Sequence, residues 1–118
     1  MAGRIERGEI RLHRFPAPDK ERPVLVLTRS SALPYLSRAT VAPITSTIRG
    51  VPSEVALGPE DGMKKACVVN LHNVMTVSQA NLGRQVAQLG PRRMREVCLA
   101  LGFALGCDGV AVEADSER

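Results

Sequence analysis

Apolar and polar residues alternate over short stretches in most of the chain, a pattern typical of β-strands. Ile10 and Leu12 alternate with polar neighbours in EIRLHRF, which predicts a half-buried strand after Gly8. The run VLVL, residues 24–27, is continuously apolar and predicts a strand buried on both faces. Further strands are predicted in ATVAPITST (39–47), GVPSEVALG (50–58), ACVVNLHNVMTVS (66–78) and GRQVAQLG (83–90).

Two of these segments contain a residue that does not fit a regular strand. Pro43 interrupts 39–47 and predicts an edge strand or a bulge, because proline cannot donate a ladder hydrogen bond. The segment 66–78 is the longest predicted strand, and its odd positions are apolar except for Asn73. Asn73 is therefore predicted to be a buried amide bonded to backbone or a residue that lines a pocket, and His72 to face solvent.

The hydrophobic period changes in GPRRMREVCLALGFALG, residues 90–106. Apolar residues recur there at helical spacing, with Pro91 suited to the first turn and Gly106 to the stop. They are Met94, Val97, Cys98, Leu101 and Leu105. We therefore predict a mainly β (α+β) fold, a small closed barrel with a C-terminal helix at about 91–106. One domain spans 1–107, and the acidic tail 108–118 is predicted to be disordered.

Composition places the chain among ordinary globular proteins. Its 118 residues are enough for one core, with 44% hydrophobic and 24% charged residues. The three cysteines form no CxxC motif, and Cys67 and Cys98 lie among apolar residues, which predicts two small core side chains in a reducing, cytoplasmic protein. The charged N-terminus does not resemble a signal peptide, and no apolar run approaches the roughly 20 residues of a membrane span.

The charge is unevenly distributed. Residues 1–107 hold 15 of the 16 Lys and Arg but 8 of the 12 Asp and Glu, a net charge of +7, whereas 108–118 carry −3. Thirteen of the basic residues are arginine, which binds phosphate in two-point contacts. A basic body indicates a polyanionic partner, nucleic acid first, although a genome rich in GC would also favour arginine.

Several common chemistries lack their motif. The sequence has no glycine-rich phosphate loop, no HExxH, no Cys/His cluster at zinc spacing and too few aromatic residues for a broad stacking platform. What remains is a set of polar residues at strand ends: Arg22 before Pro23, and Thr45, Ser46 and Thr47 followed by Arg49. Taken alone, these residues are better explained by solvated strand ends than by a binding site.

Several ordered stretches resemble the MazF/PemK toxins of bacterial toxin–antitoxin pairs. They are RGEI, RPVLVLTRS, VAPITSTIRGVPSEVAL, ACVVNLHNVMTV and RQVAQLGPRRMREVCLAL, which together cover residues 7 to about 105. The resemblance implies an SH3-like barrel of the MazF/CcdB type that forms a homodimer in the cytoplasm. It also implies a toxin that cuts single-stranded RNA, such as mRNA, at short motifs without a metal or other cofactor. The RNA's own 2′-OH attacks the phosphorus, leaving 2′,3′-cyclic phosphate and 5′-OH ends, and a cognate antitoxin covers the groove.

The resemblance also assigns site residues. Arg22 and Thr45 are expected to be catalytic, and the expected substrate-binding residues are Ser46, Arg49, Asn73, Lys20 and Arg14. The general base is left open between Arg22, His13 and His72, since arginine is a poor proton acceptor. The first loop, APDKE, is shorter than in many members, so that the family's acidic loop residue has two candidates, Asp19 and Glu21.

Two alternatives to an endoribonuclease remain at this point. The first is a non-catalytic toxin on the same fold that inhibits a protein such as DNA gyrase. Such toxins bind through the end of the C-terminal helix, where this chain instead has an acidic tail. The second is a small basic RNA-binding module without catalysis.

Overall fold

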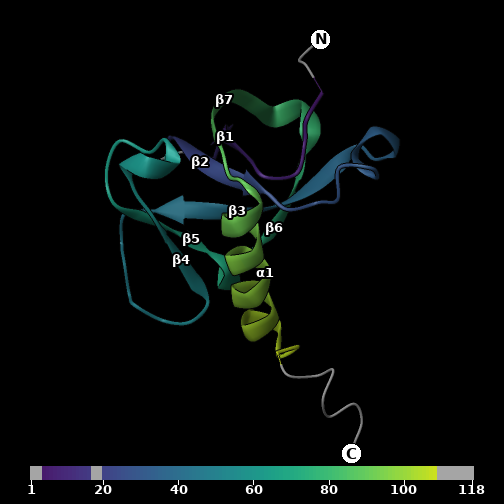
Figure 1. The fold of residues 1–118 in the computed structure, drawn as a ribbon. Helices are drawn as coiled ribbons and strands as arrows, with labels where there is room; N and C mark the ends of the chain where they lie inside the picture. The colour runs from purple at the N-terminus through teal and green to yellow at the C-terminus, as the bar shows by residue number, and fades with distance from the viewer. Residues whose placement is uncertain (1–3, 17–19, 109–118) are drawn as a thin grey trace, which may run out of the picture.

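The computed structural model describes residues 4–16 and 20–108 (Figure 1). Seven strands precede one C-terminal helix in this part of the chain. The strands are β1 (Glu9–Arg14), β2 (Glu21–Val26), β3 (Arg38–Thr45), β4 (Glu54–Leu57), β5 (Cys67–Asn70), β6 (Met75–Ser78) and β7 (Leu82–Gln88), and the helix is α1 (Pro91–Leu105). Four 3-10 turns connect them: η1 (Leu33–Tyr35), η2 (Pro59–Asp61), η3 (Leu71–Asn73) and η4 (Gln79–Asn81). The predicted tail lies outside the described residues from 109 onward.

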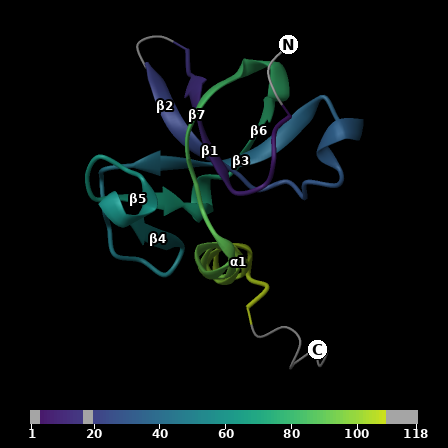
Figure 2. The ribbon, with the colours of Figure 1, turned by 45° about the horizontal axis from the view of Figure 1, so that its top comes forward.

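The strands form one antiparallel, strongly curved sheet in the order β4-β5-β3-β2-β1-β7, with β6 attached to β3 (Figures 1 and 2). The mainly β fold with a C-terminal helix is confirmed, but the prediction of a closed barrel is wrong. The sheet is not closed, because among the described residues β7 pairs with β1 but with neither β4 nor β6. It also forks at β3, which has two successive partners along one edge. Arg38–Val41 pair with β6, and Ile44–Thr45 pair with β5, so the sheet forks at this strand.

Pro43 lies inside this central strand, so the first of its two predicted explanations, an edge strand, is wrong. The second, a bulge, is absent from the β2–β3 register, which continues without a shift to Pro43. The carbonyl of Thr40 accepts from Leu27 N–H at the β2 side of β3. Backbone groups alternate along a strand, so the nitrogen of Pro43 faces the opposite side. The ladder changes there from β6 to β5, and between Val41 and Ile44 neither strand is paired with β3. The missing N–H therefore falls at the fork, where β3 passes from one ladder to the other.

The predicted long strand 66–78 is also corrected, because it is two strands separated by η3. All four residues of β5 are buried, whereas His72 and Asn73 are exposed. The side chain of Asn70 accepts a hydrogen bond from His72 N–H (3.1 Å), which turns the chain out of the β5 ladder. The alternation therefore stops at Asn70, and Asn73 is not a buried amide on the apolar face.

Apolar side chains pack on both faces of the sheet. Leu25, Ala42, Val69 and their neighbours form one core with α1, and Val24, Val26 and Val41 belong to a second core inside the curl of the sheet. Their strands are buried on both sides, which explains the continuous apolar run of β2 and confirms that prediction.

The helix begins and ends as predicted within one residue. Met94, Val97 and Ala100 bury its inner face, and Gly106 caps it in the left-handed region with φ 77°. Cys67 is buried as expected, but Cys98 is exposed and accepts a hydrogen bond from an Arg7 N–H (3.1 Å), so its prediction as a core side chain is wrong. No helix in residues 4–16 and 20–108 has the length and hydropathy needed to cross a membrane.

Candidate functional site

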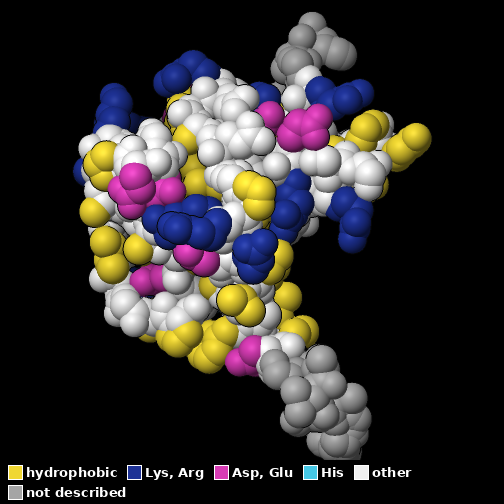
Figure 3. Space-filling view, viewed as in Figure 1, with side chains coloured by type: hydrophobic (Ala, Val, Ile, Leu, Met, Phe, Trp, Pro, Cys, Tyr) yellow, Lys and Arg dark blue, Asp and Glu magenta, His cyan; other side chains and the backbone are white. Residues whose placement is uncertain are grey.

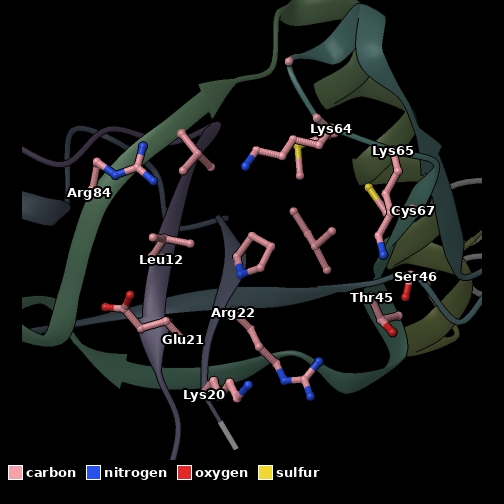
Figure 4. A pocket seen from close by; sticks show the side chains of 15 residues that line it. Leu12, Lys20, Glu21, Arg22, Thr45, Ser46, Lys64, Lys65, Cys67 and Arg84 are labelled. Carbon is pink, nitrogen blue, oxygen red and sulfur yellow. The ribbon is translucent and has the colours of Figure 1, made fainter.

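A cavity of about 590 Å³ opens between the ends of β2 and β3, the segment after η2, and β7 (Figure 4). Its apolar floor includes Leu12, Pro23, Ile44 and Val86. Polar and charged side chains of several elements surround that floor. The site is therefore a basin on the sheet, assembled from segments that are distant in sequence.

Four of the predicted site residues line this cavity: Lys20, Arg22, Thr45 and Ser46. The pairing of β2 with β3 brings the two ends together. The β2–β3 ladder reaches Val24 opposite Pro43, and the strand ends beyond this pair place Arg22 and Thr45 on the wall of the same cavity. The hydroxyl of Thr45 accepts a hydrogen bond from the backbone N–H of Thr47 (3.1 Å), which orients it at the strand end.

The structure adds three cations that sequence reasoning did not assign to the site: Lys64, Lys65 and Arg84. Figure 4 shows Arg84 across the cavity from Lys65, with Arg22 and Thr45 along the lower rim. The only acidic side chain among the described lining residues is Glu21, against five cations. The basin therefore carries a positive potential suited to an anion. The two lysines follow Met63 after the predicted Asp-Gly turn, a position that does not by itself indicate a binding role.

Three predicted substrate-binding residues do not line the cavity: Arg14, Arg49 and Asn73. The exposed guanidinium of Arg14 lies 3.7 Å from the carboxylate of Glu21. The backbone N–H of Arg49 donates to the carboxylate of Glu54 (3.1 Å), which holds its loop outside the basin. Asn73 lies in η3, which packs against α1.

Neither histidine lines the cavity. His13 is buried with its ring edge-on to Phe15 (centroids 4.8 Å apart), and its Nδ1 has no hydrogen-bond partner among the described residues. His72 is exposed, and its Nδ1 is hydrogen-bonded to Ser53 Oγ. Of the two acidic candidates from the first loop, Glu21 is in the cavity and Asp19 lies outside the described residues.

The cavity wall also contains the buried thiol of Cys67. Burial raises the pKa of this thiol, so Cys67 is protonated at neutral pH. The described residues contain no group of three His, Cys, Asp or Glu side chains placed to hold a metal ion. The arrangement offers a preorganised anion site with cationic and hydroxyl donors.

Comparison with known proteins matches residues 6–105 to the family of PemK-like, MazF-like toxins of type II toxin–antitoxin systems. The chain is 48% identical over 87 residues to the "Probable endoribonuclease MazF5" of Mycobacterium tuberculosis, covering 73% of this chain and 80% of that protein. It is 40% identical over 92 residues to the "Endoribonuclease MazF3" of the same species, covering 78% and 89%.

Solved structures show the same fold. The "Mycobacterium tuberculosis toxin MazF-mt6" superposes with a TM-score of 0.78 at 37% identity, covering 85% of this chain and 98% of that one. A mycobacterial "Endoribonuclease in complex with its cognate antitoxin" gives 0.77 at 25% identity, covering 86% and 95%. None of these relatives supports the gyrase-inhibitor alternative. The family model covers nearly the whole described chain, and the chain therefore belongs to the PemK-like, MazF-like toxins of type II toxin–antitoxin systems.

Proposed function

We propose that this protein is the endoribonuclease toxin of a type II toxin–antitoxin pair and that the cavity between β2, β3 and β7 binds the scissile phosphate of single-stranded RNA. The observation that carries the proposal is that Arg22, Thr45 and Ser46 line one basin, whose described wall holds five cations. The relatives named endoribonucleases support the reaction class.

The chemistry requires no nucleophile from the protein. The RNA's 2′-oxygen attacks the adjacent phosphorus, the bond from phosphorus to the 5′-oxygen breaks, and a 2′,3′-cyclic phosphate forms. Negative charge increases on the phosphate oxygens in the transition state. The guanidinium of Arg22 and the hydroxyls of Thr45 and Ser46 stabilise that charge without having to reorganise.

Glu21 is our candidate for the acceptor of the 2′-OH proton. It is the one carboxylate among the described lining residues, and neither histidine reaches the cavity wall. Its side chain is 46% exposed, so a proton taken from the RNA returns readily to water. The open cavity lets water supply the proton that converts the leaving 5′-oxygen into a hydroxyl.

The partners follow from the same assignment. We infer a cognate antitoxin, because relatives have been solved with theirs, and a site of action in the cytoplasm, where mRNA is translated. We also infer a homodimer, since α1 leaves Leu99 and Phe103 exposed on its outer side (71% and 47%) and Leu105 exposed at its end (62%). Sedimentation at micromolar concentration should give twice the 12.7 kDa chain mass, and a single-chain mass would contradict the dimer.

The test of the activity uses a long single-stranded RNA, purified protein free of antitoxin, and excess EDTA, followed by sequencing of the product ends. We expect discrete cuts with 2′,3′-cyclic phosphate and 5′-OH ends. Arg22→Ala should abolish most cleavage, whereas Arg49→Ala removes an equal charge outside the cavity and should not. Intact RNA with folded wild-type protein would refute the proposal, and equal losses in both variants would refute the assignment to this cavity.

A further inference from the structure

The first turn of α1 is joined to η2 by ion pairs around Arg93. Its Nε donates to Oδ1 of Asp61 (2.9 Å) and its Nη2 to Oδ2 (3.0 Å), so that guanidinium and carboxylate meet in two parallel bonds. Glu96 accepts a further N–H (2.8 Å), and the more distant Glu60 lies 3.3 Å away. The side chain of Asp61 is 7% exposed and that of Glu60 69%, so only the Asp61 pair is shielded from water. Figure 3 shows basic and acidic side chains side by side where α1 begins.

Asp61 also closes the turn to which it belongs. Its Oδ2 accepts the backbone N–H of Gly58 (3.1 Å), and Gly62 then reverses the chain at φ 91°. On the other side of the turn, a Cβ added to Gly62 would lie 3.1 Å from the Cβ of Ala87 in β7. The next residue, Met63, packs against the main core. The path of the chain after η2 is therefore held by α1, by β7 and by the core.

Lys64 and Lys65 follow directly after this constrained turn and line the cavity. Both side chains are exposed, and neither forms an ion pair within the part of the chain that the structure describes. We infer that Lys64 and Lys65 bind RNA phosphates next to the scissile one, and that the Arg93–Asp61 pair, outside the cavity, positions them. The inference rests on the proposed function for the identity of the polyanion.

The positioning role and simple electrostatics predict opposite changes in affinity for a polyanion when Asp61 loses its charge. An ammonium on a flexible stem has no fixed geometry of its own, so its contribution depends on where the backbone places it. Removing the negative charge of Asp61 makes the region more positive, which by itself strengthens binding to a polyanion. If Asp61 positions the lysines, its loss must instead weaken that binding.

The experiment measures binding of a fluorescent, mixed-sequence single-stranded DNA by anisotropy over a range of salt concentrations. This probe has no 2′-OH and cannot be cut by the proposed chemistry. The double variant Lys64→Ala/Lys65→Ala should raise Kd by about a hundredfold, or about tenfold for each charge-assisted contact that is lost. The slope of log K against log salt should fall by about 1.4, or about 0.7 for each lost phosphate contact.

Asp61→Asn should raise Kd by about threefold, and its matched control is Glu60→Gln. Both changes remove one negative charge from adjacent positions of the same turn, but only Asp61 makes the shielded contact with Arg93. Glu60→Gln should leave Kd unchanged or lower it slightly. Arg93→Lys keeps the positive charge but loses the two-point contact with Asp61, so it should raise Kd as Asp61→Asn does. If Asp61→Asn does not fold, Arg93→Lys takes its place in the experiment.

Two results would overturn the inference: lysine variants that bind as tightly as the wild type, or Asp61→Asn binding more tightly, as Glu60→Gln does. If the protein also cuts RNA, the lysine variants should raise KM and leave kcat unchanged, since they hold substrate and transition state alike. A protein that binds through Lys64 and Lys65 but leaves RNA intact would refute the proposed function, while the two lysines would keep their role in binding a polyanion. One that cuts RNA with unchanged KM in the lysine variants would refute the inference alone.

Discussion

Replacing Gly62 by alanine tests whether the turn leading into the cavity depends on its close approach to β7. Gly62 has φ 91°, a conformation that costs an L-residue about 1–2 kcal/mol. The added Cβ would also meet the Cβ of Ala87 at 3.1 Å, so one of the two segments must shift by a few tenths of an ångström. Such overpacking costs about 1 kcal/mol or more.

Gly50 provides a matched control for the first of these two costs. It has φ 74°, and no atom lies within 4 Å of the position that a Cβ would occupy, so Gly50→Ala carries the backbone penalty without a contact. The lower entropy of the unfolded chain offsets each penalty by roughly 0.4–1 kcal/mol and cancels in the comparison. We therefore expect Gly62→Ala to lower the free energy of unfolding by about 1 kcal/mol more than Gly50→Ala does.

Urea unfolding measures this difference, and the protein concentration is held fixed because the proposed homodimer would make stability concentration-dependent. The double variant Gly62→Ala/Ala87→Gly removes the contact between the two Cβ atoms but keeps the backbone penalty. Its free energy of unfolding should therefore fall by less than the sum of the decreases in the two single variants. Equal costs for Gly62→Ala and Gly50→Ala would show that the turn does not press against β7. The segment that carries Lys64 and Lys65 would then be held by α1 and the core alone.

The remaining predictions concern activity, acid stability and thiol chemistry. Arg22→Ala and Thr45→Ala should each lower the rate of RNA cleavage by about 10²–10³-fold, with unfolding curves like that of the wild type; normal rates in either folded variant would remove that residue from the catalytic site. The hydrogen bond from Arg93 holds the pKa of Asp61 below its ordinary value of 3.8. The ionised carboxylate therefore stabilises the folded protein fully above pH 3.8, and this contribution is lost as the pH falls through the lower folded-state pKa. Asp61→Asn should therefore flatten the fall in the free energy of unfolding between about pH 5 and pH 2, and an unchanged acid limb would contradict this contribution. A maleimide should modify Cys67 more slowly than the two exposed cysteines, because burial raises the pKa of its thiol. Peptide mapping of the early products measures the order of modification, and modification of Cys67 first would contradict its burial.

Local patterns predicted the elements that have a single clear period. The alternation in EIRLHRF, the apolar run before Thr28 and the helical spacing after Gly90 each correspond to an element within a few residues of its predicted bounds. They succeed because each of these elements buries its apolar side chains in a regular way. The prediction of one long strand over 66–78 was wrong for the opposite reason. A hydrogen bond to the Asn70 side chain ends β5, although apolar residues continue to alternate in the sequence beyond it.

The candidate site divides in the same way. Arg22, Thr45 and Ser46 were predicted from strand ends whose residues resemble a family motif, and the β2–β3 register brings them to one cavity. Asn73 was assigned from a face that it does not share, because η3 interrupts the strand. Lys64, Lys65 and Arg84 carried no local signal of a binding role, since exposed lysines and arginines are common on any surface.

The sequence by itself determined the β-rich class, the terminal helix and the family, because hydrophobic period and ordered motifs are properties of neighbouring residues. Only the tertiary structure decided that the sheet forks at Pro43 and stays open, and that a loop, a strand end and β7 share one basin. Those outcomes depend on which strands pair and in which register. That choice is made by burial on both faces of β2 and β3 and by contacts such as Arg93–Asp61, which join residues 32 positions apart.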